Sequence, residues 1–211
     1  MVSDAKARMI EGAARLLAEK GLQETSFSEV VALTGAPRGS IYHHFPGGKA
    51  SLVAQALDLQ RAKSIAVIES ARGLPAVEVA ATFLDAWRRL LLASHFTIGC
   101  SAVAVAVAAD SDDLLEQSGA VFRDWAGLLA ELLTLGGVPA GAAGGAAALL
   151  VAGSEGGVIL SRAQSSIEPF EAVAEQLIAH VRGLSLPAGQ PPTRSTAGGA
   201  HVPSRIAPSG Q

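Results

Sequence analysis

The residues best suited to chemistry lie on one short segment near position 40. Arg38, Gly39 and Ser40 open this segment, and Tyr42 and His43 follow. A guanidinium group can donate two hydrogen bonds to guanine or a charge-assisted bond to a phosphate. The adjacent glycine permits close approach, and the Tyr and His side chains offer donors suited to phosphate oxygens. This combination predicts contact with nucleic acid.

Other kinds of chemistry find no support in the sequence. The single cysteine, Cys100, excludes an intrachain disulfide and a cysteine-rich metal site, and it has no basic neighbour to activate it as a thiol sensor. His43 and His44 are adjacent, so on a helix they point about 100° apart and cannot easily share a metal ion. A nucleophile–base set and a phosphate-binding loop are both missing. We therefore expect no enzyme, no metal and no cofactor.

Three predicted helices would position the residues near 40. Ser26 and Glu29 have the spacing of a capping box at the start of the second helix. The turn 34–37 contains Gly35 and ends in Pro37, which is favourable at the start of the third helix. Two short helices joined by such a turn are typical of a helix-turn-helix unit, whose second helix enters the major groove of DNA. The three helices are predicted over residues 4–20, 27–33 and 38–45.

The rest of the chain predicts a helical body. Residues 101–109 alternate Ala and Val like a strand, but no second strand-like segment is present to pair with them, and alanine favours a helix. We therefore expect a short buried helix there and an all-α fold of about nine helices. The others are predicted over 49–72, 76–94, 112–135, 139–162 and 168–182. The predicted domains are a helix-turn-helix head (1–48), an effector-binding and dimerisation body (49–183) and a disordered, proline-rich tail (184–211).

Charge and hydropathy indicate which part of the chain would face phosphate and in which compartment the protein is expected. Residues 1–50 hold six basic and five acidic residues, whereas residues 51–183 hold eight basic and fourteen acidic residues. Only the head would therefore face phosphate. The N-terminus lacks an apolar signal segment, and the longest apolar stretch, 146–160, is interrupted by Ser154 and Glu155. We expect a cytoplasmic protein without membrane contact.

Most aromatic residues of the predicted body recur on helix-periodic faces. Each could be ordinary core, but together they could also line an apolar ligand pocket between helices. Ser94, His95 and Thr97 are polar side chains that could orient a ligand there. Such a pocket predicts a small hydrophobic effector. The predicted ligand-binding residues are Phe83, Trp87, Leu91, Phe96, Phe122, Trp125 and Glu155.

Glycines recur four residues apart in the predicted helix 139–162, at Gly141 and Gly145 and again at Gly153 and Gly157. Each glycine weakens a helix by about 1 kcal/mol, but small residues at this spacing let another helix approach closely. Two uses remain open. One is a homodimer interface formed together with the last helix, and the other is a tight contact within the chain.

The run from Thr34 to Lys49 (Thr-Gly-Ala-Pro-Arg-Gly-Ser-Ile-Tyr-His-His-Phe-Pro-Gly-Gly-Lys) closely resembles the recognition segment of the tetracycline-repressor (TetR) family. Its Phe-Pro-Gly-Gly-Lys ending is similar to the LmrA/YxaF-type branch, as are Gly99-Cys100 before the Ala/Val helix and the late Glu155-Gly-Gly. The resemblance extends over residues 4–57 and more loosely over 75–183. The Ala/Gly-rich helix after Pro139 departs from the usual family body.

The resemblance implies an all-α homodimeric repressor that binds palindromic operator DNA and is released by an effector. The dimer would form through the last two helices. Two other functions remain open: a regulator controlled by a protein partner, and an adaptor that no longer binds DNA. Free amides at the start of the helix that begins at Lys49 could also take a phosphate. The positions that the resemblance assigns to DNA contact are Ser26, Arg38, Ser40, Tyr42, His43 and Lys49.

Overall fold

The computed structural model describes residues 2–185, and every regular element in this range is a helix. The predicted all-α class is therefore confirmed. The predicted helix ends are close to those observed: α7 matches at both ends, and α9 extends three residues further. Most of the predicted tail lies outside the described residues. The helices of residues 2–185 are α1 (Val2–Lys20), α2 (Phe27–Thr34), α3 (Arg38–His44), α4 (Gly48–Glu69), α5 (Ala76–Ala93), α6 (Ser101–Ala108), α7 (Asp112–Leu135), α8 (Ala140–Gln164) and α9 (Glu168–Ser185).

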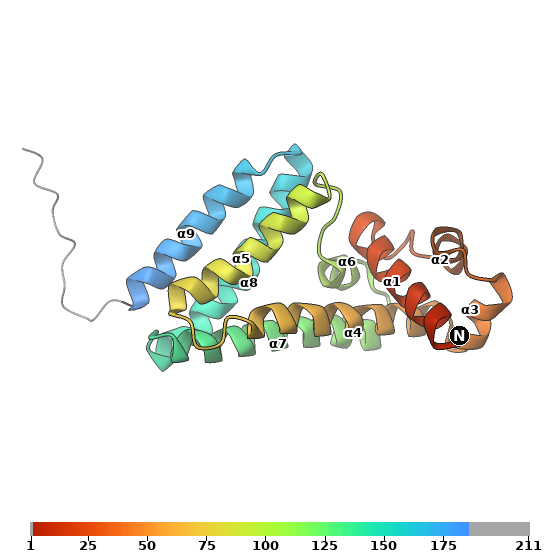
Figure 1. Cartoon of the computed structure of the whole chain (residues 1–211), viewed down its shortest axis with the longest axis horizontal. Helices are drawn as coiled ribbons and strands as arrows, with labels where there is room; N and C mark the ends of the chain where they lie inside the picture. The colour runs from red at the N-terminus through yellow and green to blue at the C-terminus, as the bar shows by residue number, and fades with distance from the viewer. Residues whose placement is uncertain (1, 186–211) are drawn as a thin grey trace, which may run out of the picture.

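The helices form two groups along the long helix α4 (Figure 1). Helices α1, α2 and α3 gather at one end as the head, and α5, α8 and α9 lie at the opposite end. Helix α7 runs beside α4, while α6 lies between the two groups and contacts both α1 and α7. Because α4 packs against α1 as well as α5 and α7, it belongs to both groups.

Local chemistry determines where α2 begins and ends. Ser26 caps its start, because the hydroxyl oxygen accepts a hydrogen bond from the Glu29 amide at 3.2 Å. The Glu29 carboxylate turns instead to Lys20, with 3.4 Å between Oε2 and Nζ, so only half of the predicted capping box forms. Gly35 ends the helix in the left-handed region (φ 66°), where a side chain would be strained. The tight turn that follows leads directly into α3.

One buried core runs through the head into the body. Ile41 and Phe45, at the base of α3, are each 1% exposed and belong to the same buried cluster as Leu17 of α1 and Leu52 of α4. The cluster continues along α7 through Trp125 and the leucines beyond it. Burial of these apolar side chains therefore holds the head against the start of α4.

The buried face of α7 is formed mainly by Leu114, Val121, Trp125, Leu129 and Leu132. Leu114 and Val121 are buried, whereas Leu115 is 41% exposed and Phe122 is half-buried. Leu115 therefore lies outside the buried face of α7, and Phe122 lies at its edge. Leucines occupy both position 114 and position 115, so helical periodicity alone could not decide which one points inward.

Two glycines of α8 make a close contact with α9 in the same chain. A Cβ atom at Gly153 would lie 3.0 Å from the Leu177 side chain, and one at Gly157 would lie 3.1 Å from the ring of Phe170. This pair therefore serves the intrachain contact that the sequence left open. Gly141 and Gly145 are exposed, with open space where a side chain would be.

Helix α8 is the one helix of residues 2–185 that is long and apolar enough to cross a bilayer. Half of its most apolar window is buried by other helices, and the buried residues include Ser154 and Glu155. A core helix of a folded domain meets the same criteria of length and apolar composition.

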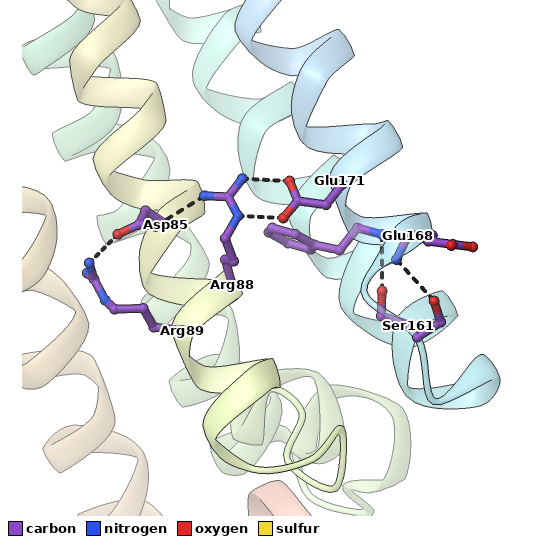
Figure 2. Close-up of polar contacts among 8 residues, drawn as sticks. Asp85, Arg88, Arg89, Ser161, Glu168 and Glu171 are labelled. Carbon is purple, nitrogen blue, oxygen red and sulfur yellow. Dashed lines mark hydrogen bonds and ion pairs between the residues drawn. The ribbon is translucent and has the colours of Figure 1, made fainter.

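A bidentate ion pair joins α5 to α9 (Figure 2). The Arg88 guanidinium donates from Nε and Nη2 to the two carboxylate oxygens of Glu171, at 2.6 and 2.7 Å, and from Nη1 to Asp85 at 3.1 Å. Beside it, the Ser161 hydroxyl accepts a hydrogen bond at 3.0 Å from the amide of Phe170. The hydrogen bonds from Arg88 hold the pKa of Glu171 below its usual value.

Glu171→Gln should destabilise the fold by about 1 kcal/mol or less at pH 7, because the pair is partly exposed. A lowered carboxyl pKa contributes stability above the unfolded-state pKa, and this contribution is lost as the pH falls through the folded-state value. The difference should therefore disappear in acid, as measured by urea unfolding at several pH values. Glu175→Gln, at an exposed site of the same helix, is the matched control. A pH-independent difference would contradict the assignment.

Candidate DNA-contact surface and apolar pocket

The start of α3 carries the exposed side chains that were predicted to meet DNA. Arg38 and Gly39 are exposed and Ser40 is half-buried. Among the described residues, no carboxylate pairs with the Arg38 guanidinium, so its donors are available to a partner. A Cβ atom at Gly39 would meet nothing within 4 Å, so the surface beside Arg38 is open.

Tyr42 is presented outward by the aromatic core beneath it. Its side chain is 67% exposed, and the edge of its ring meets Phe27 with centroids 5.2 Å apart. Phe27 packs in turn on the buried Phe45, at 6.4 Å. The ring of His43 is exposed and lies against His44 at 5.5 Å. Across the described residues, no group of three potential metal ligands occurs.

Ser26 and Lys49 also have roles within the fold. The Ser26 hydroxyl caps α2, and the Lys49 ammonium donates hydrogen bonds to the carbonyls of Leu22, at 2.6 Å, and Gln23, at 3.4 Å. Lys49 thereby fastens the start of α4 to the turn after α1. DNA contact by these two residues stays a prediction.

A cavity of about 270 Å³ opens between α4, α5, α7 and the start of α6. Small-molecule sites typically measure roughly 300–1,000 Å³, so this one suits a small ligand. Three of the seven predicted ligand-binding residues, Phe83, Trp87 and Trp125, line it. The lining residues are Leu57, Gln60, Lys63, Ser64, Val67, Ile68, Phe83, Ala86, Trp87, Leu90, Gly99, Cys100, Ser101, Ala102, Val121 and Trp125.

Trp125 fixes the aromatic wall of this cavity. Its indole nitrogen donates a 2.7 Å hydrogen bond to the Ser64 hydroxyl on α4. The rings of Phe83 and Trp87 both meet it edge-on at 6.2 Å, and Phe122 does so at 5.8 Å. Edge-to-face packing and a satisfied N–H group hold the indole in one orientation. The wall is therefore rigid.

The other four predicted ligand-binding residues lie off the cavity. Leu91 is fully buried core, and Phe96 sits in the loop between α5 and α6. Phe122 packs against Trp125, away from the lining. Glu155 is buried on α8 beside Cys100. The polar candidates Ser94, His95 and Thr97 likewise belong to the α5–α6 loop and do not line the cavity.

Sequence reasoning missed the wall that α4 contributes. Leu57, Gln60, Ser64 and Val67 recur at spacings of three and four residues, which places them on one side of the helix. Two polar residues within an otherwise apolar stripe were the available signal. Lys63 lies at the edge of the same wall, 58% exposed, with its ammonium 4.0 Å from Glu11.

Comparison with known proteins identifies the family to which this chain belongs. Residues 9–56 match the family described as bacterial regulatory proteins, tetR family, and residues 76–176 match the LmrA/YxaF-like C-terminal domain of transcriptional regulators. An uncharacterized HTH-type transcriptional regulator of Mycobacterium tuberculosis is 35% identical over 177 residues, which cover 81% of this chain and 90% of the relative. The chain belongs to the TetR family of transcriptional regulators, in its LmrA/YxaF branch.

One further relative and one solved structure are similar to this chain in sequence and in fold. The HTH-type transcriptional regulator LmrA of Bacillus subtilis is 26% identical over 171 residues, covering 79% of this chain and 91% of LmrA. The crystal structure of a regulatory protein TetR from Rhodobacter sphaeroides has the same fold, with a TM-score of 0.76 at 19% identity, over 83% of this chain and 98% of that one. The family consists of transcriptional regulators, so this chain is not an enzyme.

Beside the pocket of this TetR-family chain lies an unusual buried carboxyl group. Glu155 is 8% exposed, and neither of its carboxylate oxygens has a hydrogen-bond partner of good geometry among the described residues. Burial raises its pKa to about 7, and this effect outweighs the lowering effect of the neighbouring Cys100 thiol. Burial and the charge of Glu155 raise the pKa of Cys100 well above its usual value. The thiol is therefore not activated, as the sequence predicted.

Glu155→Gln should stabilise the fold above pH 7 by up to about 3 kcal/mol, because a pKa raised from 4.5 to about 7 corresponds to roughly 1.4 kcal/mol per unit. A raised carboxyl pKa makes the folded state lose stability as the pH rises from the unfolded-state value to the folded one. The gain should therefore shrink to nothing in acid, as measured by urea unfolding. Glu24→Gln, at an exposed position, is the control. An equal gain at every pH would contradict the prediction.

Proposed function

We propose that this TetR-family regulator is a cytoplasmic homodimeric repressor that binds palindromic operator DNA and is released by a small apolar effector. The observation that carries the proposal is the exposed start of α3. Arg38 has no carboxylate partner among the described residues, and Tyr42 stands outward on a buried aromatic base. This is the placement that a recognition helix needs to reach base edges and phosphates.

A dimer is required because one α3 offers few contacts. Two copies of the head must lie one DNA turn apart, roughly 34–36 Å, to enter successive major grooves. We place the dimer interface on the outward side of α8, together with α9. Large apolar side chains are exposed there although α8 is otherwise a core helix, and burial against a second copy would remove them from water. They are Leu149, Ile159 and Leu160, with Gly141 and Gly145 on the exposed side as well.

The cavity is the site that we assign to the effector. Its lining is mostly apolar, with Phe83, Trp87 and Trp125 on one wall and the polar side chains Gln60 and Ser64 on α4. Since α4 also packs in the head, a ligand that shifts α4 would change the position of α3. Such a ligand weakens operator binding only to the extent that it binds the two arrangements with different affinity.

Arg38→Ala should weaken binding to the duplex upstream of the protein's own gene by about 1–3 kcal/mol, which is roughly 5- to 150-fold in Kd. The measurement is fluorescence anisotropy over a range of salt concentrations, since phosphate contacts make affinity fall with salt. Arg123→Ala, which removes an exposed arginine of α7, should bind like the wild type. Wild-type protein without salt-sensitive binding would reject the repressor function and favour an adaptor.

Ile159→Glu should convert the dimer into a monomer, because it places a charge on the proposed apolar interface. Sedimentation velocity should show the change in mass, and operator affinity should fall with it. Leu135→Glu introduces the same charge at an exposed leucine of α7 and should leave the dimer intact. A dimer that survives Ile159→Glu would place the interface elsewhere.

A further inference from the structure

The loop between α5 and α6 touches both the cavity and the head. Gly99 and Cys100, at its end, line the cavity. The Gly99 amide also donates a 2.8 Å hydrogen bond to the carbonyl of Ala18, in the last turn of α1. The final carbonyls of a helix have no partner within that helix, so this bond satisfies one of them. A single residue thus contacts the pocket and the first helix of the head.

Arg162 strengthens the same junction from α8. Its Nη2 atom donates to the carbonyl of Glu19 at 3.3 Å and to the carbonyl of Thr97 at 3.0 Å. The first carbonyl belongs to the end of α1 and the second to the α5–α6 loop. The cationic guanidinium is favourably placed, because the carboxyl end of a helix carries partial negative charge. One side chain therefore ties together α8, α1 and the loop.

The loop is tightly constrained at this point. A Cβ atom at Gly99 would lie 2.5 Å from Nη1 of Arg162, so any side chain there would displace the guanidinium. Earlier in the loop, His95 and Phe96 both have left-handed backbones, with φ of 50° and 63°. Non-glycine residues rarely adopt this region and keep it only where surrounding contacts hold them. The loop therefore has strain that a different arrangement would relieve.

We propose that Arg162 is a positioning residue that couples the pocket to the DNA-binding head through this loop. A ligand that presses on Gly99 or Cys100 shifts the loop, and the shift reaches the end of α1 through the Gly99 amide and the Arg162 guanidinium. This inference rests on the proposed effector control and adds a second connection to the one through α4. Its physical basis is that the α5–α6 loop contacts both the pocket and the head. A change at either site can therefore shift the arrangement of the loop.

A covalent probe can occupy the pocket without knowledge of the natural effector. Cys100 is the only cysteine of the chain and lines the cavity. Benzyl methanethiosulfonate forms a disulfide between its benzylthio group and the Cys100 sulfur; methanesulfinate leaves, and the thiol proton goes to the buffer. The reaction is run in alkaline buffer until mass spectrometry shows that the modification of Cys100 is complete. Both tryptophans, Trp87 and Trp125, line the cavity, so a change in their fluorescence reports entry of the benzyl group.

The measured quantity is the ratio of operator Kd after and before modification, so a variant's own affinity does not affect it. For the wild type we expect a ratio of about tenfold, within the range usual for coupled sites. Arg162→Gln should reduce the ratio to less than about twofold, and Arg162→Lys, which keeps the charge, should restore part of it. Arg123→Gln, an arginine removed from the surface of α7, should retain the wild-type ratio.

Each outcome either supports or overturns the coupling role of Arg162. A full ratio in Arg162→Gln would overturn this inference and leave effector control in place. A ratio of one in the fully modified wild type would overturn effector control, and this inference with it. If Arg162→Gln does not fold, by circular dichroism, Gly99→Ala replaces it, because its methyl group displaces the same guanidinium. A full ratio in Gly99→Ala would then overturn the coupling role.

Discussion

The seven residues of α3 are too few to form a stable helix on their own, because a helix of this length does not recover the cost of its first turn. Its shape depends on the burial of Ile41 and Phe45 where α3 packs against α1 and α2. The exposed side chains at its start, Arg38 among them, are held in place by these two buried ones. The DNA-contact surface of this chain therefore depends on apolar packing beneath α3.

The same dependence on shared packing extends into the body. Helix α4 supplies Leu52 to the core of the head and Gln60 and Ser64 to the wall of the pocket. The hydrogen bond from Trp125 to Ser64 fixes α4 against α7 at the level of the cavity. The pocket and the head thus share helix α4. Arg162 provides a further contact to the head, at the end of α1.

The sequence predicted the features that are encoded locally. The start of α7 is an example, since Ser111 caps it with a hydrogen bond from the Leu114 amide at 3.4 Å. The pocket was predicted only in part. Phe83, Trp87 and Trp125 reach it, but the side of a helix that faces a cavity, rather than core, depends on tertiary packing. The contacts of Arg162 join it to residues 65 and 143 positions away, and no local pattern signals such a pairing.

The glycines at 153 and 157 carry a consequence for evolution. Leu177 and Phe170 occupy the space that a side chain at either position would need, so a larger residue there would push α9 away from α8. The two helices would then present a differently shaped outer surface, and two copies meeting through it would be set at another angle. The distance between their heads would change too. In the proposed dimer, the hydrogen atoms that stand in place of side chains at Gly153 and Gly157 would thus limit which spacing of half-sites the two heads could read.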